Sequence, residues 1–214
     1  MFENQLHDVL AKYPKLLKQT SDSITFLKGN IDIVDGVGKV WDTYEIEIHF
    51  KHEFPNRFPQ LFEVGGKIPK NLDWHIYNDG SCCVTVFPNE LLVCKQGITI
   101  LGYVEDFVIP YLANQTYKKL TGDFANGEYS HGFWGVLEFY QDLLQTKDFR
   151  LLIDRLNWIL NNSKPDRTNT CFCGSNKKFR HCHSNAYKKI NIIGRDLVYA
   201  DFENIILWHK NAVV

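Results

Sequence analysis

Polar and apolar residues alternate strictly over residues 43–50. The apolar positions are Tyr44, Ile46, Ile48 and Phe50, and the residues between them are threonine, glutamate and histidine. A period of two is typical of a β-strand with one buried and one wet face, so we expect an antiparallel strand here. Apolar positions over residues 24–33 predict a preceding strand, interrupted at Gly29-Asn30. The turn signal of residues 35–38 joins the two strands.

Apolar residues with helical spacing flank this region on both sides. Before it, one amphipathic helix is expected, with Pro14 breaking or kinking it before its last turn. Its apolar positions are Leu6, Val9, Leu10, Tyr13, Leu16 and Leu17. After a third strand at residues 61–64, helical stripes occur over residues 100–112 with a kink at Pro110, and then over residues 136–144, 151–159 and 198–206. This order of elements predicts an α+β fold.

Length and composition suit one main domain with an appendage. The chain has 214 residues, of which 44% are hydrophobic, enough to bury a sizeable core. Residues 161–165, Asn-Asn-Ser-Lys-Pro, read as a linker. We therefore expect a main domain over residues 1–162 and a smaller helical appendage over residues 163–214.

Charge and cysteine usage narrow the choice of partner and compartment. The net charge of -1 gives no electrostatic reason to expect nucleic acid or an anionic membrane as partner. No apolar run approaches the ~18 residues of a membrane span. The six cysteines are grouped as 82/83, 94 and 171/173/182, which favours a nucleophile and a metal site over three disulfides. We expect a cytoplasmic protein.

Two adjacent cysteines follow a strong turn signal. Residues 78–81, Asn-Asp-Gly-Ser, favour a tight turn because asparagine, aspartate and glycine tolerate left-handed backbone angles. With a period of two, Cys82 falls on the apolar side with Val84 and Val86, and Cys83 falls on the polar side with Ser81 and Thr85. We expect Cys82 to be buried and Cys83 to be presented.

The segment Ile76-Tyr77-Asn78-Asp79-Gly80-Ser81-Cys82-Cys83-Val84 resembles the active-site segment of ubiquitin-conjugating enzymes, Ile-Tyr-x-x-Gly-x-Ile-Cys-Leu. Residues 54–59 resemble the Tyr-Pro-x-x-Pro-Pro element of that family, and residues 98–100 resemble the Leu-Thr-Ile that opens its next helix. The resemblance covers about the first two thirds of the chain. It departs at residues 73–75, where His-Pro-Asn becomes Asp-Trp-His, and no tryptophan follows the nucleophile.

The resemblance implies a meander of antiparallel strands with flanking helices and a thioester-forming transferase activity. Cys83 matches the nucleophile, and His75 takes the place of the asparagine that stabilises the oxyanion. The acyl donor would be a protein with a flexible C-terminus. Similar bacterial proteins occur in antiphage operons of the CBASS type, beside a cGAS-like nucleotidyltransferase whose C-terminus is the acyl group.

A second cluster of cysteines lies beyond the linker. Cys171, Cys173, Cys182 and His183 can close a tetrahedral zinc shell without an open position, which favours a structural Zn²⁺. The string also resembles the SEC-C motif, Cys-x-Cys-Gly-Ser-x-x-Lys-x-x-x-Cys-His, found at the tail of the bacterial translocation ATPase. The alternative is a basic loop with thiols that hold no metal.

Other interpretations remain for several residues. Cys83 could be an ordinary small residue of a strand, and His75 a structural or surface imidazole. His131 reads as a cap or turn residue, with gating of access to Cys83 as the alternative. The chain could also be a catalytically silent binding module. The basic residues of the tail favour a solvated face, or contact with an acidic protein or nucleic acid; they are Lys177, Lys178, Arg180, Lys188 and Lys189.

Overall fold

The computed structural model describes residues 2–51, 53–125 and 129–212. The chain forms two compact units, and each is discontinuous in sequence. The first unit contains Met1–Thr85 and Gly97–Glu128, and the second contains Val86–Gln96 and Tyr129–Val214. The chain therefore passes between the units three times, and each unit is built from two separate stretches.

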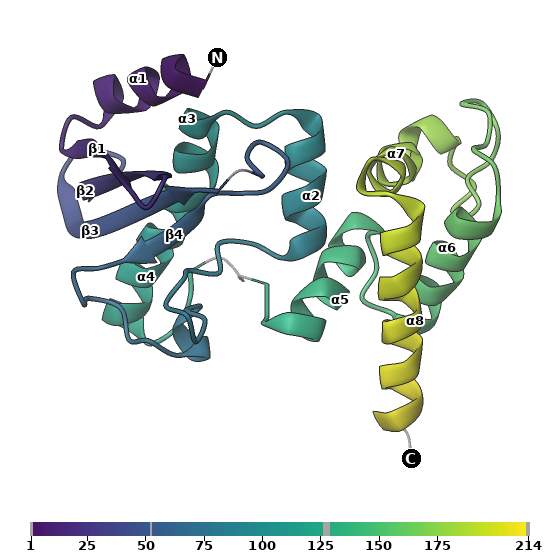
Figure 1. Cartoon of the computed structure of the whole chain (residues 1–214). Helices are drawn as coiled ribbons and strands as arrows, with labels where there is room; N and C mark the ends of the chain where they lie inside the picture. Colours follow the sequence, from purple (N-terminus) through teal and green to yellow (C-terminus); the bar gives the residue numbers. More distant parts are fainter. Residues whose placement is uncertain (1, 52, 126–128, 213–214) are drawn as a thin grey trace. The chain divides into compact units, whose positions relative to one another are not determined.

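An antiparallel sheet of four strands forms the centre of the first unit (Figure 1). The strands follow one another in chain order: β1 (Leu16–Ser21), β2 (Ile24–Val34), β3 (Val40–Phe50) and β4 (Gln60–Glu63). Each strand pairs with its successor, as short connections favour. The sheet confirms the mixed α and β architecture expected from the sequence.

Register places the apolar residues of β2 and β3 on one face. Leu27 pairs with Ile48 and Ile31 pairs with Tyr44, and all four side chains are buried. The turn between these strands is held by Asp35, whose Oδ1 accepts hydrogen bonds from two backbone N–H groups, those of residues 37 and 39. The alternation that predicted β3 thus reports the buried face directly.

The structure corrects two details of the expected elements. β2 runs through Gly29 without interruption. Glycine suits this position because φ is 148° and a Cβ there would meet the Lys15 carbonyl oxygen at 2.1 Å. Leu16 and Leu17 belong to β1 and not to the first helix. The helix ends before Pro14, whose ring and missing N–H prevent it from continuing.

Helices complete the first unit. α1 (Phe2–Lys12) contacts β1 and α3 (Ile100–Tyr103), and α4 (Ile109–Thr121) contacts β2 and β3. A π-helical turn, Val104–Val108, joins α3 to α4 just before Pro110, the residue at which a kink was expected. Buried apolar residues from the sheet and these helices form the core, among them Leu6, Val9, Leu27, Ile46, Tyr103 and Leu112.

Helices are the main regular elements of the second unit in its described residues (Figure 1). It contains α2 (Phe87–Gln96), α5 (Gly132–Leu143), α6 (Phe149–Asn161), α7 (Ser184–Ile193) and α8 (Arg195–Ala212). The spacing of apolar residues predicts α5, α6 and α8 but not α2 or α7. One core joins all five helices, with buried residues that include Leu92, Tyr140, Leu156, Ile190 and Ile205.

This packing divides the chain differently from the boundary expected between residues 162 and 163. α5 and α6 precede that boundary, yet they share their core with α7 and α8. The apolar face of α6, formed by Leu152, Leu156 and Ile159, is buried in that core. Residues 161–165 are thus a connection within the second unit.

Within the described residues, no helix is both long enough and apolar enough to cross a membrane.

Candidate functional site

The segment before Cys83 is a compact loop and not a regular strand. A turn of 3-10 helix, Leu72–Trp74, ends at His75, which has the left-handed angles φ 53° and ψ 39°. Asp79 then closes the next turn, because its Oδ1 accepts hydrogen bonds from both the N–H and the hydroxyl of Ser81, at 2.9 and 2.6 Å. Isolated bridges, including the one between Ile76 and Cys82, replace the short strand suggested by the alternation.

The two neighbouring thiols differ in environment as the alternation predicted. Cys82 is only 8% exposed, and burial raises the pKa of its thiol to about 12. Its N–H donates to the Leu61 carbonyl oxygen at 2.8 Å. Cys83 is half-buried, and its N–H donates to the His75 carbonyl oxygen at 2.8 Å. Ser81 departs from the expected pattern: it is buried, and its hydroxyl donates a hydrogen bond to Asp79.

Polar groups surround the sulfur of Cys83. The Tyr77 hydroxyl donates a hydrogen bond to Sγ at 3.0 Å, and the Thr85 carbonyl oxygen lies 3.8 Å from Sγ. A ring nitrogen of His75 lies within 4.8 Å of the same atom. Tyr77 had no expected role from the sequence. The available signal was the turn itself, in which the Tyr77 N–H donates to the Ser81 carbonyl oxygen and so brings residue 77 back towards residue 83.

Side chains of α4 hold the backbone at Trp74 and His75. The Tyr111 hydroxyl donates to the carbonyl oxygens of both Trp74 and His75, each at 3.2 Å, and the Gln115 amide donates to that of Trp74 at 3.1 Å. The imidazole is 6% exposed and packs edge-on against Phe124 with ring centroids 5.0 Å apart. His75 is therefore a buried, oriented side chain and not a surface residue.

His131 occupies the N-cap position of α5, and its side chain makes no capping hydrogen bond there. His131 thus lies at a helix start, as expected of a cap or turn residue, but its side chain does not cap the helix.

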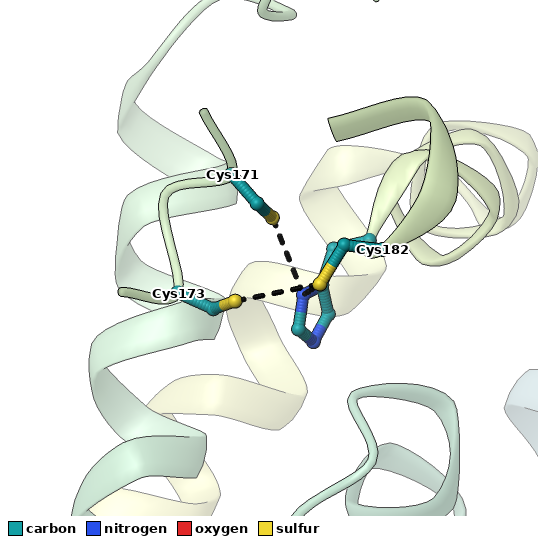
Figure 2. Close-up of side chains that lie close together, drawn as sticks. Cys171, Cys173 and Cys182 are labelled. Atoms are coloured by element: carbon teal, nitrogen blue, oxygen red, sulfur yellow. Dashed lines mark hydrogen bonds between the residues drawn. The ribbon is translucent and has the colours of Figure 1, made fainter. Parts of the chain in front are cut away.

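A second group of reactive side chains gathers in the loop before α7. The sulfur atoms of the three labelled cysteines point towards one another (Figure 2). Cys173 Sγ lies 3.5 Å from Cys182 Sγ, while His183 Nδ1 lies 3.4 Å from Cys171 Sγ and 3.1 Å from Cys182 Sγ. All four ligand atoms lie within 4.8 Å of one another. The loop thus brings together the four residues expected from the sequence.

These distances fit the edges of a small tetrahedron. With metal–sulfur bonds of ~2.3 Å and metal–nitrogen bonds of ~2.0 Å, tetrahedral coordination places two ligand atoms about 3.5–3.8 Å apart. The sulfur–sulfur separation of 3.5 Å and the sulfur–nitrogen separations of 3.4 and 3.1 Å are up to about 0.4 Å shorter than these edges. The donor set is therefore compatible with a metal ion held by three sulfurs and one nitrogen.

The surrounding structure orients His183. Its Nε2 lies 3.0 Å from the Leu144 carbonyl oxygen, so a proton on Nε2 leaves Nδ1 as the lone-pair donor that faces the thiols. A backbone carbonyl in this position is a common outer partner of metal-binding histidines. The loop is also fixed to α6, since Phe172 stacks on Trp158 with ring centroids 4.3 Å apart.

The thiols of the cluster differ in acidity. Burial raises the pKa of Cys171. Burial would also raise the pKa of Cys173, but hydrogen bonds from Ser175 and the neighbouring thiols outweigh it and lower that pKa. One thiolate is thus accessible near neutral pH, and a bound cation would favour deprotonation of the others.

Comparison with known proteins identifies the same loop. The model of the SEC-C motif matches residues 167–185, which contain all four candidate ligands. No curated protein and no solved structure matches the chain. The match is confined to the loop and the start of α7, and the second unit therefore carries a SEC-C motif.

Proposed function

We propose that the chain is a bacterial acyl carrier similar to ubiquitin-conjugating enzymes, in which Cys83 forms a thioester with the C-terminus of a partner protein and passes it to an amine. The observation that supports this most directly is the setting of Cys83. Its half-buried sulfur follows a tight turn, accepts a hydrogen bond from Tyr77, and lies near the buried ring of His75.

The proposed chemistry uses these groups in order. The Cys83 thiolate attacks an activated acyl carbon, the S–C bond forms, and the activating group leaves. A hydrogen bond from the Tyr77 hydroxyl favours the thiolate over the thiol. An amine then attacks the thioester carbon, the thiolate leaves and the amine loses a proton. In our proposal, His75 donates a hydrogen bond to the oxyanion of each tetrahedral intermediate.

The acyl donor that we propose is a cGAS-like nucleotidyltransferase of an antiphage system. This part of the proposal rests on the resemblance of residues 76–84 to the active-site segment of ubiquitin-conjugating enzymes, and on the need for a flexible C-terminus that can reach a half-buried thiol. Co-expression of the chain with the proteins encoded beside it would supply the donor and any activating enzyme that it requires.

The test is to trap the adduct under such co-expression. Cys83→Ser should convert a thiol-sensitive adduct into an oxyester that survives reducing agent, because an alkoxide leaves less readily than a thiolate. Cys82→Ala is the matched control and should keep the thiol-sensitive adduct. Peptide mapping that places the adduct on Cys82, or an adduct that is unchanged in Cys83→Ala, would contradict the proposal.

A catalytically silent binding module is the second candidate. The observation that favours it is the replacement of the family's asparagine by His75, whose ring packs against Phe124. Under this alternative, the chain would bind its partner with unchanged affinity after Cys83→Ala, and no adduct would form in the wild type.

For the second unit, we propose that Cys171, Cys173, Cys182 and His183 hold a structural Zn²⁺. The support is the convergence of four donor atoms together with the Leu144 carbonyl that orients His183. A closed set of four protein ligands leaves no position for substrate, which favours a structural role. Metal analysis of the purified chain should give about one zinc per molecule, and this content should be lost in Cys171→Ser and retained in Cys83→Ser.

A further inference from the structure

A groove between α5 and α8 is lined by residues that neither proposed site uses. Its volume is about 520 Å³. Within the second unit the two helices lie antiparallel along it, since Phe133 meets Trp208 at one end and Tyr140 meets Asp201 at the other. The spacing of these residues, seven apart on each helix, keeps each pair on one helical face.

Asp201 places a negative charge in this groove. The Tyr140 hydroxyl donates to its Oδ2 at 2.7 Å, and Tyr140 is fully buried. Burial raises the pKa of Asp201, and the hydrogen bond from Tyr140 opposes that rise. Across the described part of the chain, no lysine, arginine or histidine forms an ion pair with Asp201. A half-buried carboxylate without a cation is costly, and it gains from any cation that enters the groove.

The opposite end of the groove is aromatic. The ring centroid of Trp208 lies 5.1 Å from that of Phe133 and 4.4 Å from that of Trp134, and Trp134 remains 47% exposed. Along α8 the step from residue 201 to residue 208 is about 10 Å. Val136 and the buried Ile205 line the groove together with these end groups. The groove thus combines an acidic end, an apolar wall and an aromatic end.

From this arrangement we propose that the groove between α5 and α8 binds a lysine side chain of a protein partner. The ammonium group meets the carboxylate of Asp201, the aliphatic stem lies along Val136 and Ile205, and a neighbouring apolar side chain of the partner packs on the rings of Phe133 and Trp208. Lysine fits better than arginine, because Tyr140 already occupies Oδ2 and only Oδ1 is left for the ligand. A guanidinium group gains most from two oxygens, whereas an ammonium group needs one.

Calorimetry with the full chain tests this inference. The probe is a capped alanine-based peptide with one leucine and, four positions later, one lysine; the comparison peptide carries acetyl-lysine instead. We expect saturable binding of the lysine peptide and roughly 10- to 100-fold weaker binding of the acetylated one, as the loss of a charged hydrogen bond implies. Asp201→Asn should weaken binding of the lysine peptide by a similar factor, while the amide oxygen of the new side chain still accepts a hydrogen bond from Tyr140. Glu203→Gln, an exposed acid of the same helix, is the matched control and should bind as the wild type does.

Three results would overturn the inference. These are equal binding of the two peptides, wild-type affinity in Asp201→Asn, and no saturable binding of the lysine peptide at all. Competition with spermidine separates a protein partner from a small cation. If spermidine displaces the peptide at a concentration equal to or lower than that of the peptide, the groove recognises a free polyamine and the proposed partner is wrong.

Discussion

Replacing His183 with alanine should release the zinc that we propose for the second unit. The change removes one of four donors, and it also removes the partner of the Leu144 carbonyl oxygen. Structural zinc sites bind with ~10–16 kcal/mol of apparent free energy, so one ligand in four accounts for about 2.5–4 kcal/mol. Zinc affinity should therefore fall by roughly 70- to 900-fold.

His181 supplies a matched control two residues away. It is exposed, it belongs to the same loop, and its Nε2 contacts Arg180 instead of the thiols. Competition with a coloured chelator would measure zinc affinity in the wild type, His183→Ala and His181→Ala. Circular dichroism should show a lower melting temperature for the first variant only. Equal affinity in His183→Ala and the wild type, or an equal loss in His181→Ala, would refute the ligand assignment.

Three further predictions address other parts of the chain. At pH 8, iodoacetamide should modify Cys83 well before Cys82, whose pKa burial raises to about 12; peptide mapping that finds Cys82 modified first would contradict this. Asp42→Asn should lower the free energy of unfolding at pH 7 by ~1 kcal/mol after allowance for solvent screening. Burial would raise the pKa of Asp42, but hydrogen bonds from Lys119 and Lys67 outweigh it and hold the pKa far below its usual value. This stabilisation is present above the unfolded pKa of ~3.9 and is lost as the pH falls through the folded value, so urea denaturation should show a smaller difference at pH 3 than at pH 7. Gly135→Ala should destabilise the second unit by ~1–3 kcal/mol although alanine favours helices, because its Cβ would lie 1.9 Å from the Ser130 carbonyl oxygen. Gly36→Ala, with no atom within 4 Å of the added Cβ, is its control, and an equal melting temperature for both variants would rule out this steric reason.

The strand β3 and the cluster of four candidate metal ligands could be predicted from the sequence, because each depends on residues that are close together in the chain. The period of two over Tyr44 to Phe50 reports one buried face of β3, and the ligands Cys171 and Cys173 lie in one short loop with Cys182 and His183. The expected burial of Cys82 follows from the same local rule.

The features that the sequence pattern does not predict depend on contacts between distant residues. α2 has apolar residues that are not confined to one stripe, and its buried Leu92 shares a core with helices more than 40 residues later. Leu16 continues the helical spacing of α1, yet its pairing with Gly29 places it in β1. The hydrogen bonds from Tyr111 to the His75 carbonyl oxygen and from Gln115 to the Trp74 carbonyl oxygen likewise join residues about 40 positions apart, and no local pattern reports them.

The interleaved order of the two units limits how the chain can be divided. A protein that ended at residue 162 would keep α2, α5 and α6 but lose α7 and α8, and the apolar surfaces of Leu92 and Leu156 would be left without much of their shared core. Conversely, residues 163–214 alone would lack the Leu144 carbonyl that orients His183 and the Trp158 ring that supports the loop. The SEC-C segment of this protein therefore does not form an independent structural unit. A fusion of it to another protein would need to include α5 and α6 as well.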